Sequence, residues 1–125
     1  MMRTASLIVI TGLGFVSASQ AIVLYSPPVA RAGRAMDCVV SNVGSVPMAI
    51  QIEVIADSGQ SVGGSGTTLA PGEATRGGIA AGGILGNNDM GYCKITAVGK
   101  RRDVRALLCL GTTSGGCETV AGEAH

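Results

Sequence analysis

The chain has 125 residues, of which 9 are Lys or Arg, 8 are Asp or Glu and 46% are hydrophobic. This balance of charge provides no broad electrostatic attraction for nucleic acid or an anionic membrane, so we expect no nucleic-acid partner. Aromatic residues make up 2% of the chain and Trp is absent, which argues against a carbohydrate-binding platform. The core must therefore be built from small aliphatic side chains.

The N-terminal segment has the pattern of a secretory signal peptide. Arg3 precedes an apolar run within residues 7–16, and small residues occupy the −3 and −1 positions of a cleavage site after Ala21. The run is too short to cross a hydrocarbon layer of about 30 Å comfortably. We therefore expect residues 1–21 to be removed during export. Residues 22–125 then form one domain without a membrane span, in the periplasm or outside the cell.

The remaining chain reads as short β-strands separated by Gly, Pro, Asn and Asp, with no helical period. The clearest strand is residues 50–57, where Ile50, Ile52 and Val54 alternate with polar residues, so that one face is buried and one is wet. About seven such strands predict an all-β fold, a single antiparallel β-sandwich. In chain order the expected strands are residues 22–25, 36–43, 50–57, 67–69, 74–81, 90–98 and 103–110, with a last short strand at 117–121.

The connections between these strands carry turn-forming residues. The Gly- and Ser-rich residues 59–66 and the segment 82–89 are expected to be loops. Pro71 followed by Gly72 suits a type II turn. The Gly-Lys-Arg-Arg stretch at 99–102 is expected to close a hairpin between the strands on either side of it, and the C-terminal tail is expected to be frayed.

Four cysteines follow the signal peptide, and an even number in an oxidising compartment predicts two disulfides. Zinc is disfavoured because there is no C-x-x-C pair and the only histidine is His125. Strand alternation places Cys38 and Cys93 on inward faces, and Cys109 on the outward face of its strand. Cys93 and Cys109 are thus expected on opposite faces of neighbouring strands, which leaves the pairing Cys38–Cys93 and Cys109–Cys117.

Two short motifs resemble those of bacterial immunoglobulin-like domains. Residues 38–44 (CVVSNVG) contain the N-x-G that ends the second strand in such domains, and residues 69–73 (LAPGE) have the L-x-P-G-E that opens a later strand. Cys38 and Cys93 match their inter-sheet disulfide. The third strand lacks the Trp of antibody domains, and Tyr92 directly precedes Cys93 instead of lying two residues before it. The pattern is also similar to small exported bacterial proteins of unassigned function, so the resemblance implies an immunoglobulin-like β-sandwich and no activity.

The sequence offers no catalytic or cofactor-binding motif. A nucleophilic triad and a blue-copper site both require histidine, and His125 is the only one in the chain. The carboxylates occur at no spacing that requires them to meet, and the glycine runs lack the spacing of a phosphate-binding loop. We therefore expect no enzyme activity and no cofactor.

The one cluster of charge consists of Lys100, Arg101, Arg102 and Arg105, which is a candidate contact for an anionic surface. No aromatic side chain interleaves with these cations. The favoured interpretation is therefore a solvated hairpin tip that also keeps an edge from aggregating.

These observations predict an exported, non-enzymatic binding or structural module whose partner is an envelope or extracellular protein. A β-sandwich can add a partner's strand to an exposed edge, and the candidate edge is residues 22–25. The alternative is a subunit or accessory of a cell-surface or envelope assembly such as a pilus, which would self-associate through a strand. The sequence leaves the oligomeric state open.

Overall fold

The computed structural model of the protein describes residues 21–79, 89–111 and 117–125. The protein is all-β, as predicted, and nine strands lie in these ranges where about seven were expected. The predicted signal peptide (apart from Ala21), the predicted loop 82–89 (apart from Asp89) and the end of the strand predicted at 74–81 lie outside them. The elements are β1 (Ala21–Tyr25), β2 (Val29–Ala30), β3 (Ala35–Asn42), β4 (Met48–Ala56), β5 (Ser61–Leu69), β6 (Ala74–Ile79), β7 (Met90–Val98), the 3₁₀ turn η1 (Arg101–Asp103), β8 (Val104–Gly111) and β9 (Thr119–Glu123).

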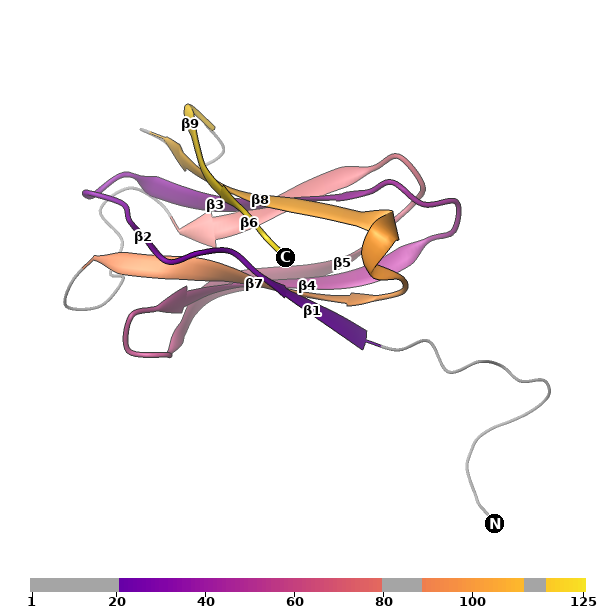
Figure 1. Cartoon of the computed structure of the whole chain (residues 1–125), viewed down its shortest axis with the longest axis horizontal. Coiled ribbons are helices and arrows are strands. Elements are labelled where there is room, and N and C mark those ends of the chain that lie inside the picture. The colour runs from indigo at the N-terminus through magenta and orange to yellow at the C-terminus, as the bar shows by residue number, and fades with distance from the viewer. Residues whose placement is uncertain (1–20, 80–88, 112–116) are drawn as a thin grey trace, which may run out of the picture.

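The strands form two antiparallel sheets that pack face to face (Figure 1). One sheet has the order β1-β7-β4-β5, with the short strand β2 also paired to β7. We call it sheet A. The other, sheet B, has the order β6-β3-β8-β9. The first strand therefore pairs with β7, and β8 pairs with β3.

The hairpin predicted between residues 90–98 and 103–110 is wrong, although both strands exist. Strand β7 lies in sheet A and β8 lies in sheet B, and η1 turns the chain from one layer to the other (Figure 1). The reason is that both edges of β7 are already occupied, by β1 on one side and β4 on the other. The chain after β7 has no free edge beside it, so β8 pairs with β3 in the opposite sheet.

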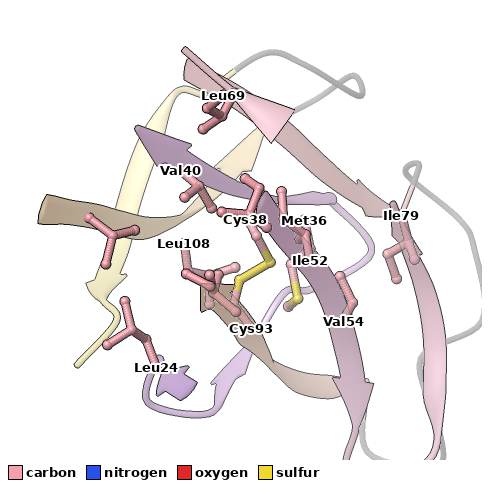
Figure 2. Packing of buried hydrophobic residues seen from close by; sticks show 14 of the residues in the cluster. Leu24, Met36, Cys38, Val40, Ile52, Val54, Leu69, Ile79, Cys93 and Leu108 are labelled. Atoms are coloured by element: carbon pink, nitrogen blue, oxygen red, sulfur yellow. A yellow bond between two sulfur atoms is a disulfide. The ribbon is translucent and has the colours of Figure 1, made fainter. Parts of the chain in front are cut away.

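The core lies between the sheets and follows the predicted alternation. On β4, Ile50, Ile52 and Val54 point inward while Gln51 is exposed. Figure 2 shows aliphatic side chains from both sheets surrounding the bridge between β3 and β7. The buried cluster comprises Leu24, Met36, Cys38, Val40, Met48, Ile50, Ile52, Val54, Ala56, Leu69, Ile79, Cys93, Ile95, Ala97, Val104, Leu108 and Leu110.

The loop predicted at residues 59–66 is wrong, because most of this stretch belongs to β5. Strands β5 and β6 are edge strands of opposite sheets, and glycine lets them approach closely. A Cβ atom on Gly63 would lie 2.9 Å from Cγ2 of Ile79, and one on Gly77 would lie 2.8 Å from Oγ of Ser65. The Cβ on Gly63 would also lie 3.1 Å from the carbonyl oxygen of Gly78, so glycine here marks the close approach of the two strands.

The turn between β5 and β6 is confirmed as type II. Gly72 has a φ of +84°, and the N–H of Glu73 donates to the carbonyl of Ala70 over 3.0 Å. Oε1 of Glu73 in turn accepts a hydrogen bond from the N–H of Ala70 over 2.8 Å. Proline then glycine at the two central positions is the combination that this geometry requires.

The C-terminal residues, which were expected to be frayed, are paired to the rest of the fold. Strand β9 runs along β8 to Glu123, and the N–H of Ala124 donates to the carbonyl of Ala106 over 3.0 Å. The backbone of His125 then exchanges two hydrogen bonds with Tyr25 of β1, at 2.9 and 3.0 Å. The tail therefore crosses from sheet B to the edge of sheet A, between the two layers in Figure 1.

Candidate functional site

Two disulfides link the cysteines in the predicted pairing. Cys38 on β3 joins Cys93 on β7 across the core, with 5.9 Å between the two Cα atoms, and we call this the core disulfide. Cys109 on β8 joins Cys117, eight residues further along the chain, and we call this the rim disulfide. The premise behind the prediction was partly wrong, since β7 and β8 are not neighbours, but the inward and outward faces were assigned correctly. Two such bridges indicate that the chain folds in an oxidising compartment.

The loops at one end of the sandwich are fastened together by Asn42, whose side chain is fully buried. Its Nδ2 donates to the carbonyls of Val46 and Leu69 over 2.8 and 3.0 Å, and its Oδ1 accepts from the N–H of Gly44 over 2.9 Å. Its backbone N–H and carbonyl bond to the turn at residues 70–73. One side chain thus fixes both the β3–β4 and the β5–β6 connections, which explains structurally why an N-x-G ends β3.

The β7–β8 connection is tied to the same place. The N–H of Val43 donates to the carbonyl of Asp103 over 2.8 Å. The three connections at residues 43–47, 70–73 and 99–103 therefore form one hydrogen-bonded unit, which we call the loop end.

The structure separates the four cations of the predicted cluster into two groups. Lys100, Arg101 and Arg102 lie on the loop end and are exposed. Arg105 lies on β8 and turns back, because its Nη1 donates to the carbonyls of Arg102 and Val104 over 2.9 and 3.0 Å. Arg105 is also exposed, but its guanidinium is bonded to this backbone, so the candidate contact surface consists of the other three side chains.

The remaining contacts of the three cations are weak. Nη2 of Arg101 approaches the carbonyl of Val23 at 3.4 Å. Nε of Arg102 lies 4.0 Å from Oδ1 of Asp103, and the Arg102 side chain is 76% exposed. An exposed pair at this distance contributes little to stability, so the guanidinium remains available to a ligand.

Sequence reasoning missed the apolar part of the loop end. Among the residues that the structure describes, five large hydrophobic side chains are exposed. Val43 (53%) and Val46 (60%) lie on the loop end, and Val98 (39%), the last residue of β7, lies directly before it. The sequence did contain a signal for Val43 and Val46, because both lie within the turn that follows Asn42. Polar residues are usual in such a turn, so apolar residues there are notable.

A groove of about 250 Å³ lies beside the loop end, where the C-terminal residues cross to β1. Arg101 and Arg105 line it, together with Glu123 and His125. Its volume is below the roughly 300–1,000 Å³ of typical small-molecule sites, and its charges are of both signs. We therefore assign it no ligand.

The edge predicted for strand addition, β1, is partly occupied. Tyr25 is paired with His125, and the carbonyl of Val23 accepts a hydrogen bond from Arg101. In sheet B, the edge strand β6 carries Arg76 near its centre, and β9 ends in Glu123. Charges of this kind on edge strands discourage pairing with other chains.

The fourth edge, β5, has none of these protections over most of its length. It is a nine-residue strand, Ser61–Leu69, with no charged residue and no proline. In the described part of the chain, the backbone of residues 61–68 has no strand partner other than β4. A β-bulge interrupts only its N-terminal end. Unprotected edges are templates for adding another strand.

A second feature that the sequence did not reveal lies at the opposite end of the sandwich. Arg31 is 3% exposed, and its Nε lies 2.7 Å from Oδ1 of Asp89. Oδ2 of Asp89 accepts a hydrogen bond from the N–H of Gly33 over 2.8 Å. These two hydrogen bonds, the one from Arg31 being the stronger influence, hold the pKa of Asp89 below its ordinary value of 3.8. The ion pair clamps the β2–β3 connection to the start of β7.

Within residues 21–79, 89–111 and 117–125, no group of three His, Cys, Asp or Glu side chains is placed to hold a metal ion. No helix in the same ranges is long and apolar enough to cross a membrane. Comparisons with protein-family models, curated proteins and solved structures gave no match.

Proposed function

We propose that the protein is an exported, non-enzymatic binding module of the periplasm or cell exterior that takes up an extended segment of another protein along β5. The observation that carries the proposal is the contrast among the four sheet edges. Strands β1, β6 and β9 are occupied or charged, whereas β5 presents nine uncharged residues. Export is supported by the signal-peptide pattern and by the two disulfides.

The chemistry of β5 favours a partner that supplies its own apolar side chains. Gly63, Gly64, Ser65 and Gly66 form the middle of the strand and bury almost no apolar area against a neighbour. Two copies of β5 paired with each other would therefore gain little beyond backbone hydrogen bonds, which is too little for a stable dimer. A partner segment that is uncharged and carries bulky apolar residues at alternate positions would itself contribute the buried apolar area that β5 lacks.

The same proposal includes an immunoglobulin-like arrangement of strands in the middle of the domain. The N-x-G and L-x-P-G-E motifs, and a core disulfide between β3 and β7, support it. The outer strands are arranged differently. In constant-type immunoglobulin domains the first strand pairs with the second and the last pairs with the sixth, whereas here β1 pairs with β7 and β8 pairs with β3. The likeness is therefore limited to β3, β4, β6 and β7.

The proposal is tested by photo-crosslinking in the natively exported protein. A photoreactive residue replaces the exposed Thr67 of β5 or, as the control, the exposed Val120 of β9. We expect one exported protein to crosslink from position 67 and not from position 120. Thr68→Lys, which places a charge on the same edge, is expected to abolish the crosslink. A peptide from the captured protein should then slow hydrogen exchange of the β5 amides.

Two other outcomes have definite meanings. Crosslinks to a second copy of the chain would replace this proposal with the alternative of an assembly subunit. Crosslinks that are absent at position 67, or equal at 67 and 120, would contradict recognition through β5.

A further inference from the structure

We propose that the loop end docks on an anionic phospholipid surface, through exposed valines flanked by cations. The surface consists of Val43, Val46 and Val98 together with Lys100, Arg101 and Arg102. This inference is independent of strand addition at β5, because it rests on different residues.

Two kinds of side chain, apolar and cationic, coincide at this end of the sandwich. Branched aliphatic side chains that are 39–60% exposed are costly in water, and three of the four such valines in the described ranges lie at this one end of the sandwich. The neighbouring cations are Arg101 and Arg102 of η1 and Lys100, which directly precedes η1. Shallow insertion of apolar groups combined with contacts from Lys and Arg to lipid phosphates is the usual chemistry of interfacial membrane binding.

This surface is also held in place by hydrogen bonds. The carbonyl of Val46 is bonded to the buried amide of Asn42, and the N–H of Val43 is bonded to the carbonyl of Asp103. The valines and the cations are thus mounted on a single hydrogen-bonded unit. Little conformational entropy is lost when they contact a surface.

The mixture of side chains also decides which anionic partner fits. Exposed valines beside cations match a surface that offers both anionic headgroups and an apolar interior. A membrane is therefore the favoured occupant over an acidic protein, which would need the cations alone.

The experiment is sedimentation of the exported, oxidised protein with vesicles of phosphatidylcholine alone or of an equimolar mixture with phosphatidylglycerol. We expect binding to the mixed vesicles that falls as salt is raised. Arg101→Gln with Arg102→Gln should weaken it about 25-fold, since each cation near an anionic surface contributes about fivefold. The control, Arg76→Gln with Lys94→Gln, removes the same net charge from the sheet faces and should change binding less than about threefold.

The apolar contribution is tested by Val43→Ser with Val46→Ser, which should also weaken binding to the mixed vesicles. These side chains are exposed, so the urea midpoint of the variant should equal that of the wild type. Equal binding to both vesicle types, or equal losses in the loop-end and sheet-face charge variants, would overturn the proposal. If the valine variant binds normally and soluble polyphosphate competes fully, the ligand is a soluble polyanion and the membrane assignment is wrong.

Discussion

Replacing Asn42 by alanine is expected to be among the most destabilising single changes in the domain. The substitution removes both donors to the carbonyls of Val46 and Leu69 and the acceptor for the N–H of Gly44. The bond to Leu69 is buried, and an orphaned buried carbonyl costs about 1–3 kcal/mol. The other two bonds are half-buried, and each contributes about 1 kcal/mol. We therefore expect the free energy of unfolding to fall by about 3–5 kcal/mol, a large part of the roughly 5–15 kcal/mol of a small domain.

The assay is urea unfolding of the oxidised protein at neutral pH. Gln51→Ala is a suitable control, because it removes an exposed amide from β4 and should cost less than about 0.5 kcal/mol. Asn42→Asp should be at least as destabilised as Asn42→Ala, since a carboxylate would face the two carbonyl oxygens without donating to them. A loss below about 1 kcal/mol for Asn42→Ala would refute the role assigned to this side chain.

Three further predictions concern other parts of the fold. Replacing both cysteines of the core disulfide by alanine should cost about 4 kcal/mol, and the same change in the rim disulfide about 2.5 kcal/mol, because the bridged residues are 55 and 8 positions apart. Urea unfolding without reductant measures both, and equal losses would contradict the entropic argument. Asp89→Asn should lower stability by a constant amount above about pH 5. That difference in stability should shrink below pH 3.8, because the stability that comes from the lowered pKa of Asp89 is lost as the folded-state carboxylate takes up its proton. A difference in stability that is independent of pH down to pH 2 would exclude the ion pair with Arg31 as its cause. Gly78→Val should destabilise by more than about 2 kcal/mol, because its Cβ would overlap the backbone of Met36 and Asp37, whereas Gly59→Asn, at an open turn position with φ of +88°, should be tolerated by the same measure.

The parts of the fold that the sequence predicted depend on local patterns. Alternation along β4 and β7 identified their buried faces, and Pro71 with Gly72 specified a turn, because these signals involve residues close together in the chain. The disulfide pairing also followed from the faces that the cysteines occupy.

The errors concern contacts between residues that are far apart in the chain. Nothing within residues 90–110 reveals that both edges of β7 are taken, so the sequence favoured a hairpin where the chain changes sheets. Gly63 and Gly77 reflect the approach of two edge strands, a fact that neither segment contains alone. Val43 and Val98 end strands predicted from the sequence and Val46 lies in a turn, and only the fold places the three beside the cations.

The connectivity of the two disulfides bears on how the chain can mature. The bridges join the first cysteine to the second and the third to the fourth, and no cysteine lies between the members of either pair. A chain exported N-terminus first would present each thiol to its native partner before any other is exposed. For such a route we expect oxidation in order of appearance to yield the native bridges with a thiol oxidant and without a disulfide isomerase.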